Sequence, residues 1–220
     1  DTLTLRVEVD VRPVFIYGRY IKNTREIPQT RWPCRSCRGR KGGCEACESS
    51  GLQYLDSVQD LIGRPFVTGM GALDTAFHGM GREDIDVRCL GGGRPFVLEV
   101  KSPRSRSPEL SDYESIISST CGGRVEVNSL RFSDRKEVAR IKQTRSEKTY
   151  TIRFSTKETI DKEKATSLIL SLSGVVVEQQ TPKRVSHRRA DKNRKRRIIS
   201  VDEVNFDGEE IEVTLRCEAG

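Results

Sequence analysis

Apolar and polar residues alternate over several stretches of this chain, and such alternation predicts β-strands. Every second residue from Leu3 to Val9 is apolar, so the first strand is expected over residues 2–9. Aromatic and β-branched residues predict a second strand over residues 13–22. Further strands are expected over residues 125–130, 150–154, 175–177, 198–201 and 211–215. An Asp207-Gly208 turn precedes the last of these strands.

A hairpin is expected over residues 84–100. Residues 84–88 alternate charged and aliphatic side chains, as a half-buried strand does. The glycines at 91–93 then supply a tight turn, because glycine adopts the positive φ angles that hairpin turns require. Residues 94–100 return as the second strand. Asp84 is therefore expected at the mouth of a hairpin, on a rigid element.

Helices are expected over residues 56–62, 110–117, a short part of 133–147, and 159–171. Asp56 is the expected N-cap of the first helix, and Pro108 stands at the expected start of the second. The last helix has apolar residues at spacings of three and four, and Gly174 ends it. Many strands with separate helices predict an α+β fold.

Four of the seven cysteines follow the spacing C-x2-C-x6-C-x2-C, at Cys34, Cys37, Cys44 and Cys47. Four thiolates at two tight turns suit tetrahedral zinc, and four sulfur ligands leave no open position for a catalytic water. The prediction is a structural Zn²⁺ in an insertion over residues 31–54. The alternatives are two separate redox pairs or disulfides. Clustered cysteines beside scattered ones indicate a reducing, cytoplasmic setting.

Positive charge is concentrated near the C-terminal end. The chain carries a net charge of +7, and residues 181–200 hold nine Lys or Arg and one Asp, so the remaining residues sum to −1. A basic stretch on a nearly neutral body predicts an anionic partner, and the alternative is a solvated loop. No apolar run approaches the roughly 20 residues that a membrane helix needs, so no membrane partner is expected.

One block and three shorter stretches carry a resemblance to a known family. The block GREDIDVRCLGGGRPFVLEV at residues 81–100 resembles the catalytic motif of the Pus-ten family of tRNA pseudouridine synthases. Residues 14–20, 148–150 and 181–189 resemble other parts of the same family, in the same order. Four ordered blocks are far more specific than a lone R-x-D.

The resemblance implies the pseudouridine synthase fold, a mixed and mostly antiparallel central sheet with flanking helices and a cleft along one face. Residues 1–220 are then expected to form one catalytic domain, with residues 31–54 as a zinc-binding insertion. The family's next motif would follow Gly220, so the domain is expected to be incomplete at its C-terminus. A family RNA-binding domain of THUMP type is expected to precede Asp1.

Asp84 matches the family's catalytic aspartate, and Tyr150 matches its active-site tyrosine. By resemblance, Asp84 stabilises or attacks the anomeric carbon, or acts as a base at the neighbouring ribose carbon. If residues 82–88 form a strand, Arg82 and Asp86 share the face of Asp84. Asp86 is then the rival carboxylate, and Arg82 a substrate-binding residue that keeps Asp84 ionised. The remaining alternative is a solvated ladder of paired charges that extends to Arg88.

The predicted partner is tRNA, bound through phosphates and splayed bases. The predicted substrate-binding residues of the basic stretch are Arg184, His187, Arg188, Arg189, Arg194, Lys195, Arg196 and Arg197. The expected function is an isomerase that converts uridine to pseudouridine in the TΨC arm, at tRNA positions 54 and 55. No organic cofactor is expected, because the isomerisation is redox-neutral. The alternative is a non-catalytic zinc-containing RNA-binding protein, and the oligomeric state is left open.

Overall fold

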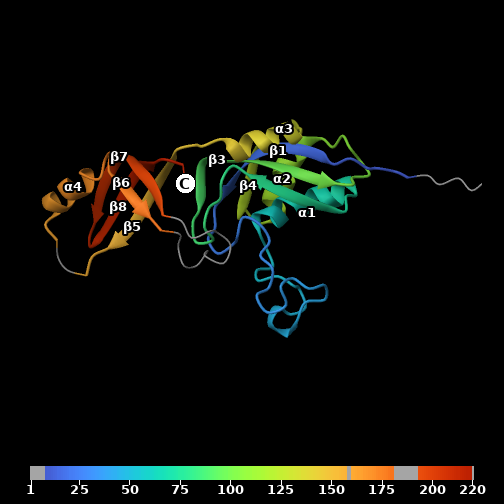
Figure 1. The fold of residues 1–220 in the computed structure, drawn as a ribbon, viewed down its shortest axis with the longest axis horizontal. Helices are drawn as coiled ribbons and strands as arrows, with labels where there is room; N and C mark the ends of the chain where they lie inside the picture. Colours follow the sequence, from blue (N-terminus) through green and yellow to red (C-terminus); the bar gives the residue numbers. More distant parts are fainter. Residues whose placement is uncertain (1–7, 158–159, 181–192, 220) are drawn as a thin grey trace, which may run out of the picture. The chain divides into compact units, whose positions relative to one another are not determined.

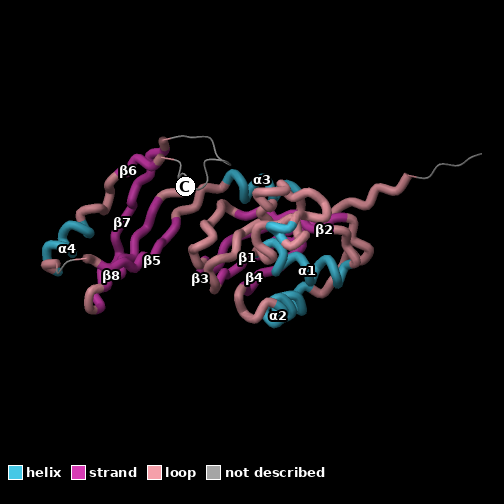
Figure 2. The backbone as a smooth tube through the Cα atoms, turned by 90° about the horizontal axis from the view of Figure 1, so that it is seen from below, coloured by secondary structure: helices cyan, strands magenta, loops and turns pink. Residues whose placement is uncertain are grey.

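The structure is a computed structural model that describes residues 8–157, 160–180 and 193–219. The chain divides into two compact units, the first ending at Thr144 and the second beginning at Arg145. Figure 1 labels most of the helices and strands of both units, and Figure 2 also labels β2. Antiparallel sheets and four helices confirm the α+β class that the sequence predicts. A single catalytic domain over residues 1–220 stays a prediction.

The first unit is built on a four-stranded antiparallel sheet. Its strands are β1 (Val14–Lys22), β2 (Asp74–Gly79), β3 (Cys89–Lys101) and β4 (Val125–Ser133), in the order β2-β3-β1-β4. Burial alternates strictly along β1, so every second residue from Val14 to Lys22 points into the core. The sheet therefore has two distinct faces, and each face is covered by helices.

Helices α1 (Val58–Met70) and α2 (Leu110–Thr120) cover one face of this sheet, and α3 (Arg135–Gln143) covers the other (Figure 2). On the first face, Ile16 of β1 packs with Ile62 of α1 and Ile117 of α2, and all three are fully buried. On the opposite face, Phe15 of β1 packs against Ile141 of α3. This three-layer arrangement sets β1 and β3 at the centre of the unit.

The second unit is a smaller four-stranded antiparallel sheet with one helix. Its elements are β5 (Lys148–Ser155), α4 (Lys162–Leu170), β6 (Val176–Gln179), β7 (Arg194–Asp207) and β8 (Glu210–Cys217), with strand order β5-β8-β7-β6. Val201, Ile211 and Val213 form its buried core, with Ile169 of α4 against them. The β7–β8 hairpin turns at Gly208, whose φ of 60° favours glycine.

Several predicted elements begin at other residues. Residues 8 and 9 form no strand, and residues 2–7 of the predicted first strand lie outside the described residues. Helix α1 begins at Val58, because Ser57 accepts the Asp60 N–H as its N-cap. Asp56, the predicted N-cap, is instead paired with Arg64 at 2.7 Å and Arg124 at 2.9 Å.

Two predicted boundaries on helices also shift. Pro108 precedes α2, which begins at Leu110 with Glu109 at the cap position. Helix α4 begins at Lys162, where Asp161 accepts hydrogen bonds from two backbone N–H groups. Among the described residues, no helix has the length and apolarity that a membrane crossing requires.

A carboxylate at the start of α3 joins this helix to the sheet. Arg131 of β4 donates two hydrogen bonds to Glu137, at 2.6 and 2.8 Å, and Ser133 and Arg140 also donate to it. These bonds, with Arg131 contributing most, lower the pKa of Glu137 to about 2. A carboxylate with a depressed pKa stabilises the fold above its ordinary pKa and loses that contribution as the pH falls towards the depressed value.

We therefore expect Glu137→Gln to lower the free energy of unfolding at neutral pH. The difference from wild type should shrink as the pH falls from about 4.5 towards about 2, because over that range Glu137 binds a proton in the unfolded chain while it stays ionised in the folded protein. Urea unfolding at a series of pH values measures this difference. The control is Glu109→Gln on an exposed carboxylate that has no ion pair among the described residues. A Glu137→Gln difference that does not change with pH would contradict the assignment.

Candidate active site and metal centre

Asp84 lies on the loop that links β2 to β3, not on a strand. Residues 84–88 contain a turn at 85–86 and form no strand, and the glycines at 91–93 lie within β3. The predicted hairpin is therefore wrong in its first strand and in its turn. The observed hairpin pairs β2 with β3. Arg82, Asp84 and Asp86 are all exposed, but they share no strand face, and Arg82 donates to the hydroxyl of Thr30.

Glu83, next to Asp84, turns its side chain into the protein. This side chain is only 2% exposed. Tyr20 of β1 donates its hydroxyl hydrogen to Glu83 at 2.6 Å, and Gln29 donates to Glu83 at 3.1 Å. Arg94 of β3 pairs with the same carboxylate at 3.1 Å. Burial, and then the charge of Glu83, raise the pKa of Tyr20 well above its ordinary value, so the phenol stays a donor.

The start of the loop is held by the same residues. Gln29 donates to the carbonyl of Gly81 at 3.1 Å, and Arg94 donates to the carbonyl of Met80 at 2.9 Å. Side chains from β1, β3 and the segment after β1 therefore converge on residues 80–83.

The main chain beyond Glu83 is held from the end of β1. Lys22 is fully buried, and its ammonium donates to the carbonyls of Asp84 and Ile85 at 3.3 Å each. The backbone N–H of Glu26 also donates to Ile85 at 2.8 Å, and Arg25 donates to the carbonyl of Asp86 at 3.0 Å. Burial lowers the pKa of Lys22, while Glu83 acts in the opposite direction. The loop is thus tied down on both sides of Asp84, and the Asp84 side chain remains exposed.

Sequence reasoning missed these buried polar residues, although a signal was present. Tyr20 and Lys22 occupy the positions of β1 that alternation points inward, as Val14 and Ile16 do. A lysine at an inward strand position requires polar partners in the core. Glu83 and Arg94 lie within the block that resembles the catalytic motif. Nothing in the sequence says that Glu83 turns inward while its neighbour turns outward.

Tyr150 belongs to the second unit. It lies on β5 opposite Leu215 of β8 and is 40% exposed. Ile152 and Phe154 follow at two-residue spacing, so the same face of β5 carries three exposed apolar side chains. Asp84 belongs to the first unit.

The basic stretch is part strand. Arg194, Lys195, Arg196 and Arg197 begin β7, where they pair with β6, so these four do not lie in a loop. Lys195 and Arg197 are exposed, at 3.4 Å from Glu178 and 4.0 Å from Glu218 respectively. Arg184, His187, Arg188 and Arg189 lie outside the described residues.

The four clustered cysteines bring their sulfur atoms within 4.8 Å of one another, and all four are free thiols. The measured sulfur–sulfur distances are 3.9 Å for Cys34–Cys44, 3.9 Å for Cys37–Cys47 and 3.7 Å for Cys44–Cys47. A tetrahedral centre with metal–sulfur bonds of about 2.3 Å has edges of about 3.8 Å, whereas a disulfide spans only about 2.05 Å. The cluster therefore fits a metal ion, as predicted.

Backbone N–H groups favour the thiolate form of Cys47, whereas burial raises the pKa of Cys44 to about 11. Burial alone would raise the pKa of Cys47, but N–H groups of Cys44 and Gly51, each 3.2 Å from its sulfur, lower the pKa to about 6.

Gly43 has a φ of 62°, and a Cβ there would lie 2.4 Å from the backbone of Ser49. Only glycine permits this close turn between the two cysteine pairs.

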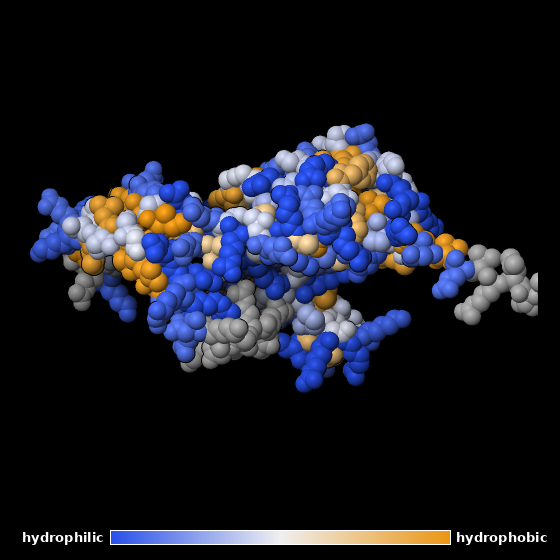
Figure 3. Space-filling view, turned by 45° about the horizontal axis from the view of Figure 1, so that its top comes forward, coloured by the Kyte–Doolittle hydropathy of each residue, from blue (hydrophilic) through white to orange (hydrophobic). Residues whose placement is uncertain are grey.

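We call residues 33–52 the cysteine knob, because a bridge between Pro33 and Leu52 closes their base. Figure 3 shows hydrophilic side chains over this part of the first unit. Arg35, Arg38, Arg40 and Lys41 are exposed and have no ion pair among the described residues. Arg31 differs from these four, because it joins the base to the body through Asp60 at 2.7 Å and Asp74 at 2.9 Å.

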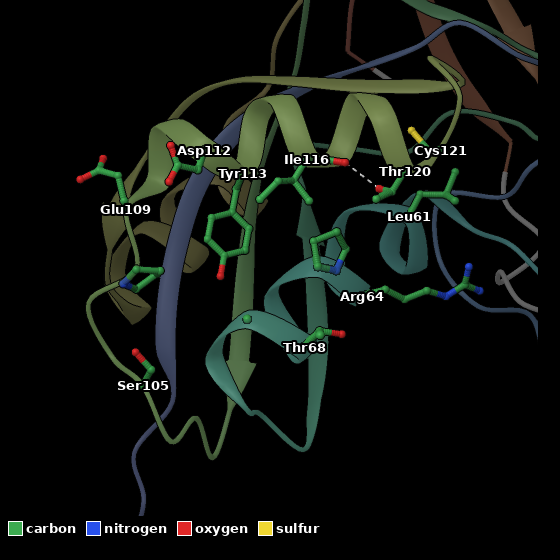
Figure 4. Close-up of a pocket in the computed structure, with 13 residues that line it drawn as sticks. Leu61, Arg64, Thr68, Ser105, Glu109, Asp112, Tyr113, Ile116, Thr120 and Cys121 are labelled. Carbon is green, nitrogen blue, oxygen red and sulfur yellow. Dashed lines mark hydrogen bonds between the residues drawn. The ribbon is translucent and has the colours of Figure 1, made fainter.

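A groove of about 620 Å³ lies between α1 and α2 (Figure 4). Its walls include Leu61 and Pro65 of α1 and Ile116 of α2. The ring of Tyr113, which also lines it, stacks on the ring of Phe66 with 4.1 Å between the ring centroids. None of the residues predicted as catalytic, substrate-binding or metal-ligating lines it. The groove is thus separate from the Asp84 loop and from the cysteine knob.

Comparison with known proteins gives one consistent result. The family model described as "Pus10, C-terminal" matches residues 15–220. A protein of Methanothrix thermoacetophila named tRNA pseudouridine synthase Pus10 is 48% identical over 214 residues, which cover 97% of this chain and 47% of the relative. The protein of the same name from Archaeoglobus fulgidus is 43% identical over 220 residues, covering 100% of this chain and 60% of the relative. The chain spans about half the length of such relatives.

Proposed function

This chain belongs to the Pus10 family, and on that premise we propose that it supplies the catalytic part of an enzyme that converts uridine in tRNA to pseudouridine. The observation that carries the proposal is a family match across both units, in which the R-x-D motif lies on an anchored loop with its aspartate exposed. The match across both units also supports one catalytic domain over residues 1–220, with the pseudouridine synthase fold. We assign the TΨC arm as the target.

In the proposed reaction, Asp84 is the catalytic carboxylate. The N-glycosidic bond of the uridine breaks, the base turns, and a carbon–carbon bond forms to the same ribose carbon, while one proton moves from carbon to nitrogen. Positive charge develops at the anomeric carbon during cleavage, and a carboxylate beside it lowers the barrier either as an ion or as a nucleophile. The anchoring of the loop on both sides of Asp84 suits this role, because catalytic groups act from fixed positions.

We propose that Tyr150 contacts the uracil base of the target uridine. Its side chain is 40% exposed, and a phenol can stack on uracil through its ring and transfer a proton through its hydroxyl. The uridine must leave its stack to reach both residues, which costs a few kcal/mol that phosphate contacts offset. Arg82 is assigned to substrate binding, as an exposed cation two residues from Asp84.

For RNA binding we propose two basic surfaces. One is the stretch from Arg184 to Arg197, whose described part begins β7. The other is the exposed basic face of the cysteine knob. The four exposed basic side chains of the knob have no ion pair among the described residues, so they are available to phosphates, and each phosphate contact releases counterions from the RNA. The second candidate function, a non-catalytic zinc-containing RNA-binding protein, rests on these same surfaces and is separated from the enzyme by product formation alone.

We propose zinc as the ion of the cysteine knob, held by Cys34, Cys37, Cys44 and Cys47. Its role is structural, because four thiolates fill a tetrahedral site. We expect about one zinc per chain with Zn–S distances of about 2.3 Å, measured by metal analysis and X-ray absorption. Cys47→Ser should lose the ion, while Cys217→Ser, outside the cluster, should retain it. A disulfide within the set, or full zinc content in Cys47→Ser, would contradict the assignment.

The basic surface on β7 predicts a salt effect. Replacing Arg194, Lys195, Arg196 and Arg197 with Ala should weaken tRNA binding and reduce the slope of log affinity against log salt by up to about four units. Lys162→Ala with Lys164→Ala on α4 is the control, since α4 carries none of the assigned residues. An unchanged slope in the fourfold variant would show that these side chains are merely solvated.

The two acidic residues of the loop provide the catalytic test. In the full-length protein, Asp84→Asn should abolish pseudouridine formation and leave tRNA affinity within about threefold, because a group that acts in the transition state changes turnover rather than binding. Asp86→Asn is the matched variant two residues away and should retain measurable turnover. Single-turnover assays on unmodified tRNA measure both. An active Asp84→Asn, or an inactive Asp86→Asn alone, would overturn the assignment.

A further inference from the structure

A lysine with no exposed surface lies at the end of β1. Lys22 is fully buried, and its ammonium has no carboxylate within ion-pair distance among the described residues. It donates instead to three backbone carbonyls, those of Ile27 at 3.1 Å and of Asp84 and Ile85 at 3.3 Å. An ammonium has three donors, so all three are used. Burying a charge in this way is costly unless every donor is satisfied.

These bonds bear directly on the orientation of Asp84. Lys22 holds the carbonyl of Asp84 itself and that of the next residue, so both peptides after the Asp84 Cα are fixed. Glu26 N–H adds a second donor to the Ile85 carbonyl, at 2.8 Å. On the other side of Asp84, the carboxylate of Glu83 is buried against Tyr20. With the residues on both sides fixed, the direction of the Asp84 Cα–Cβ bond is fixed as well.

We propose that Lys22 is a positioning residue, which sets the direction of the Asp84 carboxylate by holding the Asp84 and Ile85 carbonyls. This inference rests on the proposed function. Lys22 does not touch the substrate, because it is fully buried. Its effect is on geometry, and a displacement of about 1 Å in a reacting group can lower the rate about a hundredfold.

A lysine suits this role better than a neutral side chain. Glutamine offers two donors on a shorter side chain, and methionine has similar length but no donors. Arginine presents a planar fork, whereas the three carbonyls belong to two separate chain segments. The lysine therefore links the residues after β1 to the loop before β3 through one atom.

The test uses the full-length protein with Lys22→Met, which keeps the length of the side chain and removes its donors and charge. The control is Gln59→Met, because Gln59 is also buried and donates to the Thr75 carbonyl at 2.9 Å, away from the Asp84 loop. We measure the single-turnover rate at saturating tRNA, the tRNA dissociation constant, the unfolding midpoint and hydrogen exchange of the Glu26 amide.

Lys22→Met should lower the single-turnover rate about a hundredfold, change the tRNA dissociation constant less than about threefold, and speed exchange at Glu26. Gln59→Met should keep its single-turnover rate within about threefold of the wild-type rate, although its unfolding midpoint falls about as far as that of Lys22→Met. Lys22→Gln, with fewer donors lost, should fall between wild type and Lys22→Met, and it serves as the test if Lys22→Met does not fold.

A wild-type rate in Lys22→Met or Lys22→Gln overturns the positioning role alone. A parallel loss of rate in Gln59→Met also overturns it, because the effect is then one of general stability. A wild-type protein that forms no pseudouridine overturns the proposed function and the positioning role with it.

Discussion

The buried contact between Tyr20 and Glu83 is the constraint on which the Asp84 loop depends. A carboxylate that is 2% exposed needs polar partners inside the protein. Tyr20 and Gln29 donate hydrogen bonds to it, and Arg94 forms an ion pair with it. The hydrogen bond of 2.6 Å places Glu83 inward. Asp84, its neighbour, then faces out. The exposed position of the motif aspartate is thus a consequence of a burial one residue earlier.

A second constraint of the same kind, set by sulfur rather than by carboxylate, shapes the cysteine knob. Cys34 and Cys47 are its buried hydrophobic residues, so the knob has little apolar core of its own. Its turns depend on glycines with positive φ, and its base on a single bridge between Pro33 and Leu52. A segment of this size needs a metal or a covalent link to fold. The four sulfurs lie at a spacing that suits such a metal ion.

The sequence predicted the strands and helices whose periodicity arises from a packed core. β1, β4, β5 and β8 and helices α2 and α3 lie close to their expected ranges, because a half-buried element repeats its apolar residues at its own period. Residues 84–88 also alternate in exposure, yet they make no ladder. Alternation reports which side chains are buried and says nothing about backbone pairing, so the loop was mistaken for a strand. The first residues of β7 pair with β6, but the sequence did not predict a strand there. They carry four basic side chains instead of an apolar face, so they show no apolar alternation.

The candidate site could be located from sequence but not oriented. The motif indicates Asp84 as a candidate by resemblance. The residues that hold its loop, Lys22 and Glu83, are polar groups in the core whose partners lie some 60 residues apart in the chain. Such a network is a costly way to stabilise a fold, because apolar residues of similar volume would bury at less expense. The network does fix the direction in which a side chain points, which apolar packing does poorly. Hydrogen bonds to carbonyls are directional, and a buried donor has few other acceptors within reach. A loop that must present one carboxylate at a fixed angle has reason to be held by polar contacts. On this view the buried lysine and glutamate follow from the chemistry assigned to Asp84, and stability is given up for geometry where the reaction needs it.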